Sequence, residues 1–296
     1  MINLNSNDIA IEFRLENQSN LSYKIAQPGS KFVINEECIL WAKNIDFLQK
    51  INIGTVICRK SDFNAIIPNP KVSYLTTEQS PRLVFAKVLT KYFNISAEEE
   101  IINYVEEHRK NKSIQIADYV FIGKDVEIGP GTIIHPGVAI YSRTKIGSNC
   151  VINANCSIAT EGLGLEMDPE TNLYFKFPQI GGVILEDNVE IGPSSTVRRS
   201  ALDNTIIKSA CKIGALVNIG HNCIIGNNCI LSGQNVTSGS SVLGENVFMG
   251  VGSVIKQGVN VGNNVIIGLG AVVTKHIPDN ETWMGNPAKK LEIKNS

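Results

Sequence analysis

Residues 207–226 read IKSACKIGALVNIGHNCIIG, and every sixth residue of this stretch, counted from Ile207, is isoleucine. That step matches neither the 3.6-residue period of an α-helix nor the two-residue alternation of an ordinary strand. A chain that turns a corner every six residues produces it, because each short strand then presents one aliphatic side chain to a shared interior. Three such strands make one triangular coil of 18 residues, and coils stack at the strand spacing of about 4.8 Å. The stretch therefore predicts parallel strands coiled around a narrow apolar prism.

The same step covers more than half of the chain and is interrupted twice. Residues 159–184 interrupt it first, and four extra residues between Val197 and Ile207 interrupt it again. Loops that leave a rigid scaffold commonly carry function, so we expect binding at these two places. The residue after the aliphatic one is often glycine, which suits a corner where a Cβ atom would clash or where φ is unusual. The aliphatic positions are Ile116, Ile122, Ile128, Ile134, Ile140, Ile146, Ile152, Ile158, Leu185, Ile191, Val197, Ile207, Ile213, Ile219, Ile225, Leu231, Leu243, Met249, Ile255, Val261, Ile267 and Val273, with Thr237 as the one polar exception in the last series.

Five cysteines occupy a second inward position of the repeat, four residues after the aliphatic one. A metal site or disulfides are one interpretation. Their register is that of packing, however, and we favour small apolar side chains that fill the prism in a reducing compartment. These residues are Cys150, Cys156, Cys211, Cys223 and Cys229.

Composition and charge exclude several classes of protein. Lys and Arg total 27 against 28 Asp and Glu, so the net charge is −1 and no clustered basic face for a nucleic acid or an anionic membrane is expected. No apolar run is long enough to span a membrane, and Asp8 and Glu12 stand where a signal peptide would be apolar. These features predict a soluble, cytoplasmic protein.

The regions outside the ladder suggest four segments. Residues 1–95 lack the repeat, and β-like stretches at 31–34, 55–58 and 72–75 with an amphipathic helix over 82–93 predict a small α/β domain. A capping box of Ser96 and Glu99 predicts a linker helix over 96–112. The β-helix is expected over 113–275. Pro278 and Pro287 make a further coil improbable, so residues 276–296 are expected to form a capping segment.

The strongest candidate for chemistry is His221, which lies two residues after Ile219 on an outward position. Stacking places Gly239, 18 residues later, one coil above it with no side chain between them. A neutral imidazole can accept a proton from an attacking amine. A nearby backbone N–H can hold the oxyanion of a tetrahedral intermediate. This pair is what acyl transfer from a thioester to an amine requires.

Several segments resemble the hexapeptide-repeat acyltransferases, and most specifically the LpxD type, the UDP-3-O-acylglucosamine N-acyltransferases of lipid A synthesis. The segments are GLGL at 162–165, FPQIGGV at 177–183, STVRRSALDNT at 195–205, IGHNCIIG at 219–226 and WAKNIDF at 41–47. The resemblance implies a left-handed parallel β-helix with a small N-terminal α/β domain and a short C-terminal extension. It also implies a homotrimer with active sites between neighbouring subunits.

The resemblance assigns roles to individual residues. His221 is the general base, and the family's oxyanion glycine falls on Gly239. Trp41, Asn44 and Phe47 would clasp the base of a nucleotide, since two aromatic rings can stack on it while an amide reads its edge. The residues expected to contact the sugar acceptor are Gly162, Gly164, Phe177, Gln179 and Asn222.

The C-terminal segment WMGNPAKK at 283–290 resembles the tail of CoA-dependent hexapeptide acetyltransferases that act on nucleotide-linked amino sugars. This resemblance assigns Gly285, Pro287 and Lys289 to the donor site. The predicted reaction transfers an acyl group from acyl-CoA or acyl carrier protein to the amine of a nucleotide-linked amino sugar, with UDP favoured, for lipid A or surface polysaccharide. No permanently bound cofactor or metal is expected.

Three alternatives stay open at this level. The nearest is a CoA-dependent enzyme that adds an acetyl or hydroxyacyl group to a dTDP- or UDP-linked deoxyamino sugar. A second is a β-helix metalloenzyme of the γ-carbonic-anhydrase kind, but that needs three convergent imidazoles, and His135 and His221 lack an evident third. The third is a non-catalytic scaffold that binds sugar nucleotides.

Overall fold

The computed structural model of the 296-residue chain describes residues 4–19, 21–30, 34–93 and 97–291. The chain divides into two compact units. The first unit comprises residues 1–94 and 163–179, and the second comprises 95–162 and 180–296. The insertion that interrupts the ladder after Gly162 therefore belongs with the N-terminal residues and not with the coil.

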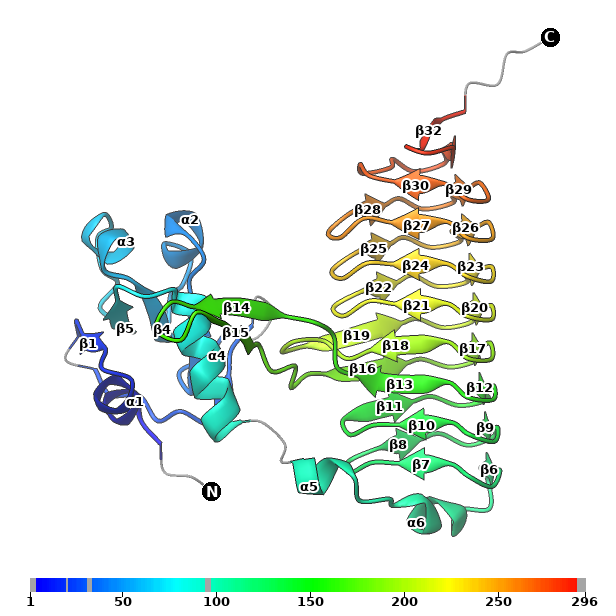
Figure 1. The fold of residues 1–296 in the computed structure, drawn as a ribbon, viewed down its shortest axis with the longest axis horizontal. Coiled ribbons are helices and arrows are strands. Elements are labelled where there is room, and N and C mark those ends of the chain that lie inside the picture. The colour runs from blue at the N-terminus through cyan, green and yellow to red at the C-terminus, as the bar shows by residue number, and fades with distance from the viewer. Residues whose placement is uncertain (1–3, 20, 31–33, 94–96, 292–296) are drawn as a thin grey trace. The chain divides into compact units, whose positions relative to one another are not determined.

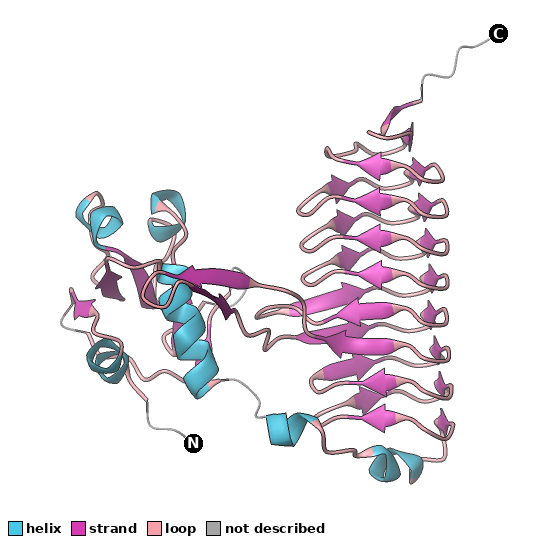
Figure 2. Ribbon diagram, in the orientation of Figure 1, coloured by secondary structure: helices cyan, strands magenta, loops and turns pink. Residues whose placement is uncertain are grey.

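The second unit is the left-handed parallel β-helix that the six-residue period and the family resemblance predict (Figures 1 and 2). Three sheets form the faces of the prism. One contains β7 (Phe121–Ile122), β10 (Ala139–Ile140), β13 (Ser157–Thr160), β18 (Thr196–Arg198), β21 (Asn218–Ile219), β24 (Val236–Thr237), β27 (Val254–Ile255) and β30 (Val272–Val273). The second contains β8 (Glu127–Ile128), β11 (Thr144–Ile146), β16 (Gly182–Leu185), β19 (Asn204–Ile207), β22 (Ile224–Ile225), β25 (Val242–Leu243) and β28 (Asn260–Val261).

The third sheet contains β6 (Gln115–Ile116), β9 (Ile133–Ile134), β12 (Val151–Ile152), β17 (Glu190–Ile191), β20 (Lys212–Ile213), β23 (Ile230–Leu231), β26 (Phe248–Met249), β29 (Ile266–Ile267), β31 (Thr282–Met284) and β32 (Lys289–Lys290). Its pairing shows the 18-residue repeat directly, because Ile213 pairs with Leu231, which pairs with Met249. The exception in the helix is the coil between Val197 and Ile219, which pair directly although 22 residues separate them. The four extra residues are accommodated in the loop between β18 and β19.

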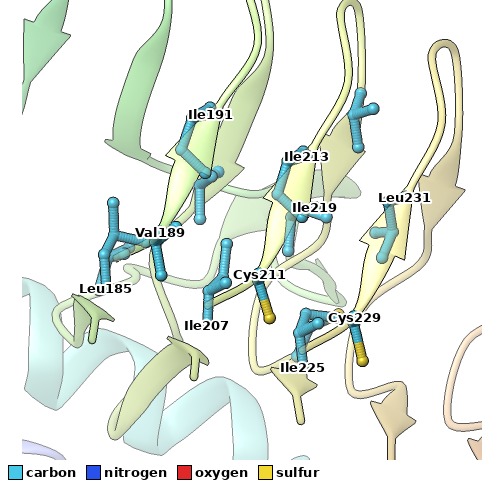
Figure 3. Packing of buried hydrophobic residues seen from close by; sticks show 14 of the residues in the cluster. Leu185, Val189, Ile191, Ile207, Cys211, Ile213, Ile219, Ile225, Cys229 and Leu231 are labelled. Atoms are coloured by element: carbon cyan, nitrogen blue, oxygen red, sulfur yellow. The ribbon is translucent and has the colours of Figure 1, made fainter. Parts of the chain in front are cut away.

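The inward side chains form one continuous apolar core. The residues of the ladder, such as Ile207, Ile219 and Ile225, are fully buried, and so are the five prism cysteines (Figure 3). Burial raises the pKa of the Cys156 thiol above its ordinary value. The interpretation of these cysteines as packing residues is thus supported. Thr237 is equally buried, and its hydroxyl has no hydrogen-bond partner within the described residues.

Glycine and asparagine have different tasks at the corners. At Gly226 a Cβ atom would lie 2.3 Å from the carbonyl oxygen of Gly244 in the next coil, so close backbone approach requires glycine there. The left-handed conformation falls two residues later, as at Asn228 and Asn246, whose φ values are +58° and +57°. The carboxamides of Asn228, Asn246 and Asn264 are also hydrogen-bonded to one another in a ladder of 2.8 and 3.0 Å.

Two predictions for the ends of the β-helix need correction. The linker helix is broken into α5 (Ala97–Glu100) and α6 (Val105–Arg109), and Ser96 of the predicted capping box lies outside the described residues. The coil also continues past Pro278, because β31 pairs in parallel with β29 and β32 then pairs antiparallel with β31. Both prolines lie in turns, where a missing N–H interrupts no ladder bond.

The first unit is a five-stranded sheet with helices, in the strand order β1-β5-β4-β3-β2. The strands are β1 (Glu16–Asn17), β2 (Gln27–Pro28), β3 (Cys38–Trp41), β4 (Gly54–Arg59) and β5 (Val72–Thr77), and the helices are α1 (Ser6–Glu12), α2 (Ile45–Leu48), α3 (Lys60–Asn64) and α4 (Pro81–Tyr92). The inserted hairpin of β14 (Leu165–Asp168) and β15 (Leu173–Lys176) completes the unit. Of the predicted β stretches, 55–58 and 72–75 lie in β4 and β5, while residues 31–33 lie outside the described residues.

Candidate active site

His221 and Gly239 lie one above the other on neighbouring coils. Their strands are in register, with Ile219 paired to Thr237. A Cβ atom placed on Gly239 would lie 2.5 Å from Nε2 of His221 and 2.6 Å from Cε1. The imidazole therefore rests against the α-carbon of residue 239, and only glycine fits there. His221 is half-buried and Gly239 is buried.

The main chain around Gly239 leaves one donor available. The neighbouring Ser240 N–H donates to the carbonyl oxygen of His221 at 2.8 Å, and the carbonyl of Gly239 accepts from Gly258 N–H at 3.1 Å. Within the described residues, no hydrogen bond uses the Gly239 N–H. The corner thus combines an imidazole nitrogen and a backbone donor in one place, as a reacting carbonyl requires.

Asn222 holds the other side of the imidazole. It adopts the left-handed conformation (φ +61°), and its Oδ1 lies 2.8 Å from Nδ1 of His221. The same Oδ1 accepts from Ala201 N–H at 3.3 Å, and Nδ2 donates to the buried hydroxyl of Ser200. The sequence predicted that Asn222 contacts the acceptor, whereas in the structure three protein groups engage its carboxamide. Ser200 and Ala201 were missed, and the only signal for them was the excess length of their coil.

Trp41, Asn44 and Phe47 come together around the end of β3 and the start of α2. Asn44 is the N-cap of α2, and its Oδ1 accepts from Phe47 N–H at 3.0 Å, so its carbonyl has a structural task. Phe47 packs partly against the core cluster around Leu48 and Val56, and Trp41 is half-buried. The amide hydrogens of Asn44 are the part of this group that stays open to a ligand, and stacking of a base on the two rings remains a prediction.

The inserted hairpin is held to α4 by charge and by aromatic packing. Arg82 forms an ion pair with Glu166 and lies over the ring of Phe177, at 4.8 Å from its centroid. Lys87 pairs with Asp168 at 2.9 Å, and these hydrogen bonds lower the pKa of Asp168 below its usual range. Of the acceptor candidates, Gly164, Phe177 and Gln179 lie in the first unit. Gly162, the remaining glycine of that set, lies in the second.

The donor candidates lie in the C-terminal hairpin. Gly285 has a φ of +89° in the turn between β31 and β32, and its carbonyl accepts from Val272 N–H at 3.0 Å. Pro287 is exposed in the same turn, and Lys289 is exposed on β32. The hairpin is also braced by Glu281, which pairs with Lys290 at 2.6 Å. Contact with a donor remains a prediction for all three candidates.

Comparison with known proteins identifies the repeats. Residues 120–160 match the family described as bacterial transferase hexapeptide (six repeats), and residues 242–275 match the hexapeptide repeat of succinyl-transferase. The second unit is a hexapeptide-repeat transferase domain. The chain is also 36% identical over 134 residues to the UDP-3-O-acylglucosamine N-acyltransferase of Helicobacter hepaticus, and 48% identical over 62 residues to that of Methylobacillus flagellatus. The predicted resemblance to the LpxD type is confirmed.

The match to these relatives is partial. It covers 45% of this chain and 41% of the Helicobacter protein, and 21% and 18% for the Methylobacillus protein. Among solved structures, the UDP-N-acetylglucosamine O-acyltransferase (LpxA) of Moraxella catarrhalis is similar, with a TM-score of 0.51 and 23% identity. That likeness covers 62% of this chain and 72% of the other, and it supports the fold of the hexapeptide-repeat domain.

The other histidines lie apart from His221. Burial lowers the pKa of His108 on α6, His135 is half-buried at a corner, and Nδ1 of His276 accepts from Asn260 N–H at 2.9 Å. In the part of the chain that the structure describes, no three His, Cys, Asp or Glu side chains gather as a metal site would require. The same part contains no helix of the length and apolarity needed to cross a membrane.

Proposed function

We propose that this protein is an N-acyltransferase that transfers an acyl group from a phosphopantetheine thioester to the amine of a nucleotide-linked amino sugar. The observation that carries the proposal is the contact between the imidazole of His221 and the α-carbon of Gly239, beside an N–H that no protein group uses. The same corner lies in the segment that resembles the LpxD type.

The geometry supplies each proton and charge that the reaction needs. Nε2 of His221 removes a proton from the amine as its nitrogen attacks the thioester carbonyl carbon. The carbonyl oxygen becomes an oxyanion and accepts a hydrogen bond from Gly239 N–H. When the intermediate collapses, the carbon–sulfur bond breaks, the amide forms, and the thiolate takes the proton that His221 holds. The histidine returns to its neutral state without any other group.

A UDP-linked amino sugar is the acceptor that we favour. The relatives that match over up to 45% of this chain carry the name UDP-3-O-acylglucosamine N-acyltransferase. Trp41 and Phe47 offer two aromatic faces to a pyrimidine, and the amide hydrogens of Asn44 can donate to one of its carbonyls. The product would serve lipid A or surface polysaccharide. Thymine would stack equally well, so a dTDP sugar is included in the test below.

The donor and the assembly are parts of the same proposal. Acyl-CoA and acyl carrier protein both present an acyl thioester, and Gly285, Pro287 and Lys289 are the residues we assign to the phosphopantetheine arm. We propose a homotrimer in which the corner of His221 faces a neighbouring subunit. The cytoplasm is the compartment that we propose, supported by five prism cysteines that remain thiols.

Thiol release by the purified protein tests the proposal. A grid of UDP- and dTDP-amino sugars is combined with short- and long-chain acyl-CoA and acyl carrier protein. We expect one combination to release thiol only when the amino sugar is present. The variant His221→Ala should lose at least a thousandfold in turnover with its fold intact, whereas His135→Ala, at another corner, should keep it. If no amino sugar stimulates release, or if both variants retain activity, the proposed function is wrong.

A further inference from the structure

The four extra residues in the coil between Val197 and Ile219 end beside the candidate base. The loop that holds them brings Ser200 and Ala201 against the side chain of Asn222. Ser200 is fully buried, and its main chain is also bonded, because its carbonyl accepts from Gly181 N–H at 3.1 Å. The position of its hydroxyl is therefore set by the coil and not by solvent.

The surroundings of the Asn222 carboxamide favour one of its two orientations. Ala201 N–H is a backbone donor and can only meet the oxygen, Oδ1. A reversed carboxamide would direct Nδ2 at this N–H, so that two donors would face each other. The hydroxyl of Ser200 accepts from Nδ2 in the observed orientation, which gives the amide nitrogen a buried partner. Oδ1 is thereby left facing Nδ1 of His221 at 2.8 Å.

An oxygen that faces Nδ1 selects one tautomer of the imidazole. Oδ1 accepts but cannot donate, so the hydrogen of the neutral ring resides on Nδ1. Nε2 then carries the lone pair, and Nε2 is the atom that lies against Gly239. A nitrogen that is to take a proton from an amine needs this lone pair.

We propose that Ser200 is a positioning residue: together with Ala201 N–H it orients the Asn222 carboxamide, which holds His221 in the Nδ1–H tautomer with Nε2 free toward Gly239. The catalytic meaning of this tautomer rests on the proposed function, but the tautomer itself does not. The four-residue excess of this coil thus has a task, which is to bring a hydroxyl and an N–H to the carboxamide.

The tautomer is measured without substrate by ¹⁵N NMR of the full chain labelled in its four histidines, at a pH where His221 is neutral. The signals of His221 are identified by their loss in His221→Gln. We expect the wild type to show protonated Nδ1 and unprotonated Nε2. Ser200→Ala should shift both nitrogens toward values averaged over the two tautomers. Asn222→Asp should keep the wild-type pattern, since a carboxylate can only accept.

Kinetics give the second measurement. Ser200→Ala should lower kcat about five- to tenfold with KM for the acceptor unchanged, as the loss of one neutral hydrogen bond predicts. Ser195→Ala is the matched control, because Ser195 is also a buried serine but donates to the carbonyl of Gly214, away from His221. Its kcat should stay within about twofold, and Asn222→Asp should retain more activity than Asn222→Ala.

The outcomes separate this inference from the proposed function. An Nε2–H tautomer in the wild type overturns the inference even if Ser200→Ala does not fold. So do unchanged ¹⁵N shifts in a folded Ser200→Ala. If no amino sugar stimulates thiol release while the shifts behave as expected, the proposed function fails and the positioning role of Ser200 stands.

Discussion

Nε2 of His221 would lie 2.5 Å from a Cβ atom on Gly239, although 18 residues separate them along the chain. The absence of a side chain at residue 239 is what leaves room for a reacting carbonyl at this corner. The imidazole and the main chain of the next coil are held in this relation by the register of β21 and β24.

Gly239→Ala is expected to lower kcat by about 100-fold or more, because the added methyl displaces the imidazole and blocks access to the N–H. Steady-state thiol release measures the loss, and circular dichroism checks the fold. Gly233→Ala is the control, since its Cβ would meet only the carbonyl oxygen of Ala215 at 3.3 Å. Full activity in Gly239→Ala would refute the oxyanion role.

Arg199→Ala is expected to destabilise the hexapeptide-repeat domain by about 2–4 kcal/mol. The guanidinium is buried, donates to the carbonyl of Ala159 at 2.7 Å and pairs with Glu100 at 3.0 Å. Its removal leaves a carboxylate and a carbonyl without their partner. Urea unfolding measures the change.

The matched control is Lys212→Ala, whose ion pair with Glu190 is exposed on both sides. It should change the free energy of unfolding by less than about 1 kcal/mol. Equal effects of the two substitutions would show that the burial of Arg199 contributes nothing.

Asp168→Asn is expected to loosen the inserted hairpin at neutral pH but not in acid. The hydrogen bond from Lys87, and then the one from Glu170 N–H, lower the pKa of Asp168 in the folded state. The stabilisation is therefore present above the ordinary pKa of the carboxyl and is lost as pH falls through the lowered one. Melting temperatures of wild type and Asp168→Asn should differ at pH 7 and converge below about pH 3.

The exposed Glu36→Gln variant serves as the control for that comparison. It should follow the wild type at every pH. A gap between wild type and Asp168→Asn that widens toward acid would contradict the assignment of the ion pair.

Asn246→Ala is expected to cost about 1–2 kcal/mol of stability. It loses the left-handed preference at φ +57° and both carboxamide bonds, to Asn228 and to Asn264. Asn246→Gly separates the two causes, because glycine keeps the backbone conformation and loses only the bonds. Chemical unfolding should rank wild type above Gly and Gly above Ala, and a reversed order of the two variants would show that the conformational cost is negligible.

Much of the hexapeptide-repeat domain could be predicted because its pattern is local. Each inward residue, such as Ile213 or Cys211, is recognised from its place in a six-residue unit, and it is buried for the same reason in every coil. The continuation through β31 could not be read in this way. Pro278 and Pro287 argue against a strand, and only the turns in which they lie make them compatible with one more coil.

The linker shows the opposite failure. A capping pattern and a balanced charge distribution predicted one helix over 96–112, but the structure has two short helices, α5 and α6. Tyr104, between them, donates its N–H to the carbonyl of Ile122 on β7. A bond to the first coil of the prism thus replaces the bond that would have continued the helix.

The amino-acid order alone determined the prism and the pairing of His221 with Gly239, because a constant step converts distance along the chain into position on a face. Where the step fails, that conversion is lost. The contact of Ser200 with Asn222, and the attachment of the hairpin to Arg82 and Lys87, follow the paths of loops without a period. Those paths are selected in the folded chain by hydrogen bonds and ion pairs between distant residues, which no local pattern encodes.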